Sequence, residues 1–143
     1  MPPTTVLRPA CALVEAKPCL ILVPGLLCTD VLWRGQVAGL ADLADITVTA
    51  EHRRHTDIGA IAAAILAAAP ERFALAGLSF GGYIALQIMR RAPHRVARLA
   101  LLNTTARGDD EGRRVLRRDY IKQVQNKKMM KWQCCRTQCE CIV

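Results

Sequence analysis

The sequence has 143 residues, of which 52% are hydrophobic and 22% charged, and its formal net charge is +8. This length and composition indicate one globular domain with a buried core and exclude an intrinsically disordered chain. The longest apolar run, Cys19 to Leu27, contains a proline and a glycine and is far shorter than the roughly 20 residues that cross a bilayer, so no membrane span is expected. The first five residues do not open a signal peptide, and we expect a cytoplasmic protein.

The predicted elements alternate between strand and helix up to about residue 105. The expected strands are residues 10–16 at an edge, Cys19–Val23, Asp45–Thr49, Phe73–Gly77 and Val96–Asn103. The expected helices are Val31–Ala41 capped by Asp30 or Thr29, a segment from Ile58 that Asp57 caps and Pro70 ends, and Tyr83–Ala92. Strands separated by helix-length segments predict a parallel sheet with helical crossovers.

The composition changes abruptly near residue 107. All 21 alanines lie at or before Ala106, whereas four of the five lysines and four of the seven cysteines follow it. We therefore divide the chain into residues 1–106 and an atypical basic tail, residues 107–143. Asp109 to Glu111 are expected to open a helix in this tail.

Ser79 is the only serine of the chain and lies in the sequence Gly77-Leu78-Ser79-Phe80-Gly81-Gly82. This is the G-x-S-x-G pattern of a nucleophile elbow, placed between a predicted strand and a predicted helix, where its geometry requires it. Glycines two residues on either side, Gly77 and Gly81, allow the strand and the helix to approach closely. The alternative interpretation is a turn serine that caps the following helix.

The chain resembles the α/β-hydrolase superfamily in three features that occur in the same order. These are the segment Leu22-Val23-Pro24-Gly25-Leu26-Leu27, which is similar to the family's oxyanion loop, Trp33 behind that loop, and the elbow at Gly77 to Gly82. The resemblance covers residues 19 to about 105. It implies a three-layer α/β fold with a parallel sheet of the α/β-hydrolase type, truncated after about four strands. We expect Trp33 to pack in the core rather than to contact substrate, because large aromatic side chains are mostly buried.

The resemblance implies that Ser79 is the nucleophile and that the backbone N–H groups of Leu26 and Phe80 form the oxyanion hole. Many members have histidine at the position of Pro24, and this departure affects the support of the loop more than the donor itself. The family's catalytic acid and histidine follow the serine in that order. Here His94 is the only histidine after Ser79, and it is interpreted as a surface residue at a helix end. No general base can be assigned, and neither an acid nor a histidine is carried over.

The loop Glu51-His52-Arg53-Arg54-His55 replaces a glycine-rich segment of many members. Two histidines suggest a metal site, but no third ligand is evident nearby, and a solvated polar loop is the preferred interpretation. The tail cysteines Cys134, Cys135, Cys139 and Cys141 lack the paired spacing of a zinc site. We expect no metal and no cofactor.

The resemblance implies hydrolysis of a carboxylic ester or related acyl bond of a small molecule, in a chain that lacks a recognisable acid and histidine. The alternative is an inactive hydrolase-like fragment, or a binding module that uses the basic tail, although no specific nucleic-acid partner is indicated. The tail is interpreted as an out-of-frame, alternatively spliced or truncated end. A sheet that stops at its fourth strand exposes an edge, so self-association through this edge is expected.

Overall fold

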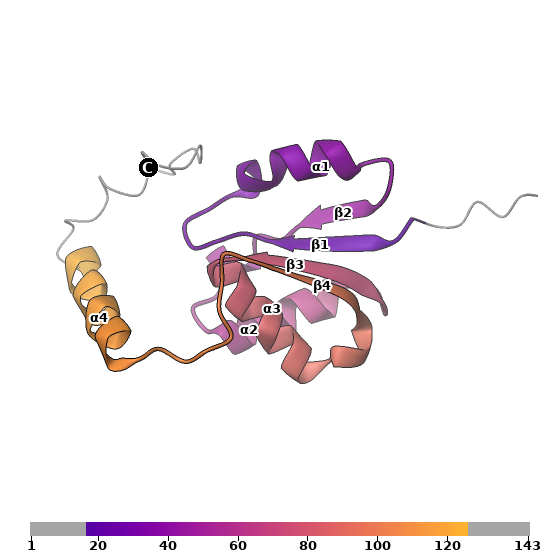
Figure 1. Ribbon diagram of the computed structural model, residues 1–143. Coiled ribbons are helices and arrows are strands. Elements are labelled where there is room, and N and C mark those ends of the chain that lie inside the picture. Colours follow the sequence, from indigo (N-terminus) through magenta and orange to yellow (C-terminus); the bar gives the residue numbers. More distant parts are fainter. Residues whose placement is uncertain (1–16, 126–143) are drawn as a thin grey trace, which may run out of the picture.

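The computed structural model describes residues 17–125, which form a four-stranded parallel sheet between two layers of helices (Figure 1). The sheet order is β2-β1-β3-β4. Its strands are β1 (Cys19–Val23), β2 (Asp45–Val48), β3 (Phe73–Leu78) and β4 (Val96–Leu102). The α-helices are α1 (Arg34–Leu40), α2 (Ile58–Ala68), α3 (Phe80–Arg91) and α4 (Glu111–Gln125), and the short 3-10 helices are η1 (Asp30–Trp33), η2 (Glu51–Arg53) and η3 (Pro93–Arg95).

The predicted parallel sheet and its helical crossovers are confirmed, and β1 has the predicted bounds. The predicted helix at Val31–Ala41 is instead a 3-10 turn followed by the short helix α1, and Thr29 rather than Asp30 caps the turn by accepting a hydrogen bond from the Val31 N–H. Asp57 caps α2 as predicted, with its carboxylate 2.9 Å from the Ala60 nitrogen. The edge strand expected at residues 10–16 lies outside the described residues.

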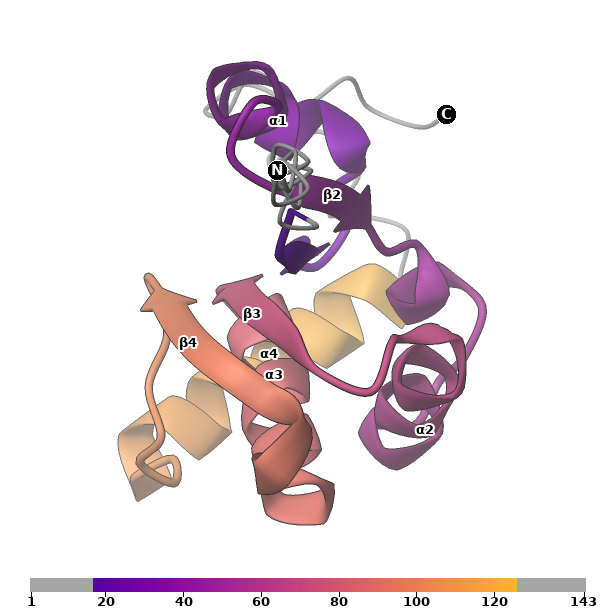
Figure 2. The ribbon, with the colours of Figure 1, turned by 90° about the vertical axis from the view of Figure 1, so that its right-hand side faces the viewer.

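The helices cover the two faces of the sheet unequally. Helix α1 lies over one face, above β1 and β2, while α2 and α3 lie together against the other face (Figures 1 and 2). The larger core is on the α2–α3 side and contains these buried residues: Ile21, Val23, Ile61, Ala62, Ile65, Phe73, Leu75, Ile84, Ala85 and Ile88. The smaller core on the α1 side is formed by Leu22, Trp33 and Ala76. Trp33 is therefore a core residue, as predicted.

The β4 edge is the least covered part of the sheet. All its residues after Val96 are exposed, and Leu99, Leu101 and Leu102 keep 38–41% of their surface accessible. None of the described strands pairs with the free side of β4. None of the helices between residues 17 and 125 combines the length and the apolar character that crossing a bilayer requires.

Candidate functional site

Ser79 occupies the sharp turn between the carboxyl end of β3 and the first residue of α3. Its backbone has φ 53° and ψ −114°, which a residue with a side chain rarely adopts. Such a conformation costs about 1–3 kcal/mol and persists only where the surrounding structure holds it in place.

The end of β4 holds this strained turn in position. The Ser79 N–H donates to the Leu102 carbonyl at 2.9 Å. Its own carbonyl accepts from the Thr104 hydroxyl and from the Gly82 N–H, each at 2.9 Å. Ser79 occupies the N-cap position of α3, but its side chain makes no capping hydrogen bond, so the alternative of a serine whose hydroxyl caps the helix is not supported.

Two glycines bring the elements around Ser79 into contact. A Cβ atom on Gly77 would lie 2.7 Å from the Gly81 carbonyl carbon, and one on Gly81 would lie 2.6 Å from the Pro24 oxygen and closer still to the Val23 oxygen. Both glycines have ordinary negative φ angles, so they are needed here for close approach rather than for a left-handed backbone. Helix α3 therefore starts directly against the end of β1.

The loop after β1 passes beside this helix start. Gly25 to Cys28 form a tight turn in which the Cys28 N–H donates to the Gly25 carbonyl at 3.1 Å. Leu27 has φ 59°, and the Leu26 N–H makes no hydrogen bond within residues 17–125. The Phe80 N–H belongs to the first turn of α3, where helix geometry leaves N–H groups without intrahelical partners. The Leu26 N–H thus belongs to the loop beside the start of α3, and the Phe80 N–H directly follows Ser79.

The polar loop after β2 is only partly solvated. Arg53, Arg54 and His55 are exposed as predicted, but the prediction is wrong for His52, which is buried. Its Nε2 lies 3.0 Å from the Cys28 carbonyl oxygen, 24 residues away in the chain. No sequence pattern around His52 signals this contact, because its partner belongs to a different loop.

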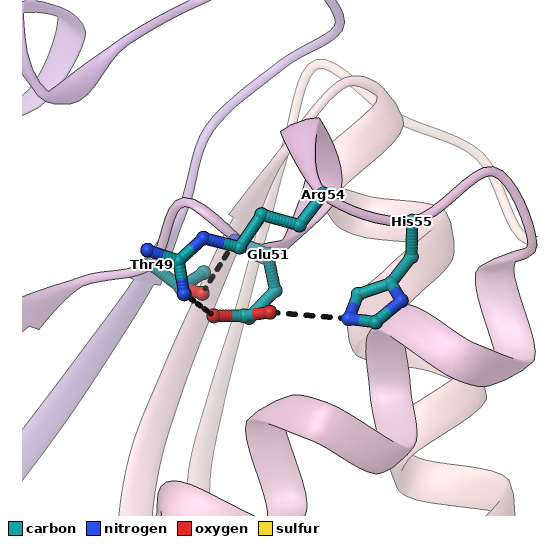
Figure 3. A network of polar contacts seen from close by, with 4 residues as sticks. All are labelled: Thr49, Glu51, Arg54 and His55. Carbon is teal, nitrogen blue, oxygen red and sulfur yellow. Dashed lines mark hydrogen bonds and ion pairs between the residues drawn. The ribbon is translucent and has the colours of Figure 1, made fainter.

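Glu51 organises the exposed part of that loop (Figure 3). Its carboxylate oxygens lie 3.2 Å from Arg54 Nη1 and 3.3 Å from His55 Nε2, and its backbone N–H donates to the Thr49 hydroxyl. The two histidines therefore have separate partners. Among residues 17–125, no three metal-ligating side chains gather into a group that could hold an ion.

Among residues 17–125, one hollow of about 260 Å³ and another of about 600 Å³ are lined by residues other than Ser79. The first lies beside β2 and α2 and is bordered by Glu51 and Arg54. The second lies near the amino ends of the strands. Neither hollow therefore gives the Ser79 turn a substrate pocket.

No described side chain serves Ser79 as a base. Nothing within residues 17–125 hydrogen-bonds its hydroxyl. His94 lies in η3, beyond the far end of the 12-residue helix α3, about 18 Å along the helix axis at 1.5 Å per residue.

Burial and the negative charge of Asp45 raise the pKa of the Cys19 thiol at the start of β1, which makes this cysteine a weaker nucleophile.

Helix α4 lies beyond the carboxyl ends of the strands, which is the end of the sheet where Ser79 also lies (Figures 1 and 2). Arg117 connects it to α3 by donating to the Tyr83 hydroxyl at 3.0 Å, and the guanidinium also lies over the Tyr83 ring. Hydrogen bonds to Asp109 and then to Tyr83 raise the pKa of Arg117, so its positive charge is retained. The tail cysteines lie outside the described residues.

Several solved structures that resemble this chain are named as hydrolases. An esterase from Thermogutta terrifontis superposes with a TM-score of 0.64 at 23% sequence identity, covering 79% of this chain and 46% of the esterase. A hydrolase from Pseudomonas aeruginosa PA01 has a TM-score of 0.59 at 23% identity, with coverage of 75% and 45%. An extracellular α/β-hydrolase from a Paenibacillus species has a TM-score of 0.56 at 17% identity, with coverage of 76% and 52%.

The sequence itself matches no protein-family model and no curated protein. The chain spans about half the length of the solved structures it resembles. Because these structures share less than 25% of their sequence with this chain, the likeness establishes its fold and not its activity. With its parallel sheet, its two helical layers and these structural neighbours, the described part of the chain has the α/β-hydrolase fold, consistent with the N-terminal part of that fold.

Proposed function

We propose that Ser79 is the nucleophile of a hydrolase that cleaves a carboxylic ester or related acyl bond of a small molecule. The observation that carries this proposal is the strained Ser79 backbone between β3 and α3, with φ 53°. A plain turn has no need of this conformation, whereas a serine nucleophile is presented above the sheet by such a turn.

The chemistry assigned to the site is acyl transfer in two steps. The Ser79 hydroxyl oxygen bonds to the acyl carbon, its proton passes to a base, and the alcohol leaves with a proton; water then releases the acid and restores the serine. The Leu26 and Phe80 N–H groups stabilise the negative oxygen of each tetrahedral intermediate, a contribution of about 3–4 kcal/mol for one such donor. No base is assigned among the described residues.

A fluorophosphonate probe tests the nucleophile on the 143-residue chain. We expect slow labelling that increases when imidazole is added as an external base, because Ser79 has no described base, and that disappears in Ser79→Ala. Thr105→Ala is the matched control, since it removes a hydroxyl near the same end of the sheet and should label normally. If imidazole at high concentration elicits no Ser79-dependent labelling, the chain is an inactive hydrolase-like fragment and the proposal fails.

We also propose that the chain self-associates through β4. Its free side has unpaired backbone groups and exposed leucines, an arrangement that favours pairing with another strand. Sedimentation should show mass increasing with concentration, and Leu101→Lys should reduce it because a lysine on an edge opposes pairing. Leu43→Lys, which changes an exposed leucine just before β2 at the opposite edge of the sheet, is the control. A monomer at every concentration would contradict the proposal.

A further inference from the structure

His52 is a buried polar residue that the proposed chemistry does not use. Only 9% of its surface is exposed. Its Nε2 lies 3.0 Å from the Cys28 carbonyl oxygen, and because a carbonyl only accepts, this nitrogen carries the hydrogen. The other ring nitrogen, Nδ1, is buried and has no partner within residues 17–125. The Cys28 carbonyl therefore fixes which nitrogen of His52 is protonated.

The turn that ends at Cys28 contains a strained residue with little packing to hold it. Leu27 has φ 59°, which is costly for a residue with a side chain. The Leu26 and Leu27 side chains are 56% and 68% exposed, so burial contributes little to their position. Hydrogen bonds at the end of the turn must provide much of the restraint, and His52 supplies one of them from the neighbouring loop.

The start of this loop is already fixed. Val23, Pro24 and Gly25 are buried, and the start of α3 packs closely against the Val23 and Pro24 carbonyls. The Leu26 N–H is thus held between a rigid segment on one side and the Cys28 carbonyl on the other. Without the His52 hydrogen bond the turn loses one of its restraints, which favours relaxation of Leu27 to a negative φ and rotation of the Gly25–Leu26 peptide plane.

We propose that His52 is a positioning residue: through the Cys28 carbonyl it holds the strained turn at Gly25–Cys28 so that the Leu26 N–H faces the oxyanion formed at Ser79. The inference rests on the proposed function, since it assigns a role to a residue outside the reacting groups. An oxyanion donor acts on the transition state more than on bound substrate, so losing its alignment lowers kcat and leaves KM nearly unchanged.

Three variants test this role. His52→Leu removes the donor and keeps an apolar side chain, while His52→Gln places an amide N–H at about the position of Nε2. His55→Gln is the matched control in the same loop. With an activated ester and added imidazole, we expect His52→Leu to lower kcat about 10- to 100-fold at constant KM, and His52→Gln to recover most of it. Unchanged kcat in His52→Leu would overturn the inference.

A second measurement separates this inference from the proposed function. Amide hydrogen exchange at the Cys28 N–H, which donates to the Gly25 carbonyl, should accelerate at least tenfold in His52→Leu and return toward wild type in His52→Gln. The imidazole ¹⁵N spectrum should show His52 protonated at Nε2. If the wild-type chain lacks Ser79-dependent activity, the proposed function fails, and the exchange data still decide whether His52 holds the turn. Unchanged exchange, or protonation at Nδ1 instead, would refute it.

Discussion

Gly81→Ala is expected to destabilise the fold by at least about 3 kcal/mol, because the added methyl group meets backbone rather than a movable side chain. The new Cβ would lie 2.6 Å from the Pro24 oxygen and closer to the Val23 oxygen, at the point where α3 meets β1. Real Cβ atoms essentially never approach other atoms this closely, so helix and strand must separate. The nearby loop Gly25–Cys28 and the Ser79 turn would be displaced together.

Urea unfolding of the wild-type chain and of Gly81→Ala measures the loss of stability. The chain also offers a matched control. Gly39 lies in α1, where a Cβ would meet nothing within 4 Å. Gly39→Ala should therefore be neutral or stabilising by up to about 1 kcal/mol through helix propensity. If Gly81→Ala unfolds at the same urea concentration as wild type, the close packing of α3 on β1 is wrong.

The sheet and the Ser79 turn were predictable because their signals are local. Alternating apolar segments, Asp57 before α2 and the glycines around Ser79 each act on the residues beside them. The bounds of β1 and the burial of Trp33 follow from the same kind of pattern.

The contacts that the sequence did not reveal join residues far apart in the chain. His52 stands among charged residues in a loop that reads as solvated, yet it is buried because the Cys28 carbonyl lies beside it. Leu27 adopts a left-handed backbone without being glycine or asparagine, so nothing in its identity indicated the turn. Nothing in the sequence predicted a role for Arg95, although its side chain makes more hydrogen bonds than any other described side chain.

Arg95→Met is expected to lower the free energy of unfolding by about 2–3 kcal/mol, because Arg95 satisfies carbonyl groups in the last turn of α2 and in the residues just after it. Its guanidinium donates to Leu66, Ala69 and Pro70 at 2.8–2.9 Å and to Glu71 at 3.4 Å. Its positive charge also lies at the carboxyl end of α2, where the helix dipole favours a cation. The guanidinium carbon also lies over the Phe73 ring, 5.8 Å from its centre, and methionine removes this cation–π contact as well.

Three variants distinguish this hydrogen-bonded cap from a general effect of removing charge. Arg91→Met removes one exposed hydrogen bond to the Gly59 carbonyl and should cost less than about 1 kcal/mol. Arg95→Lys keeps the charge but loses the planar fork, so its stability should lie between Arg95→Met and wild type. Since Arg95 lies at the opposite end of the sheet from Ser79, any Ser79-dependent labelling of the folded protein should be unchanged. If Arg95→Met unfolds no more easily than Arg91→Met, the carbonyls at the end of α2 do not depend on Arg95, and water must satisfy them instead.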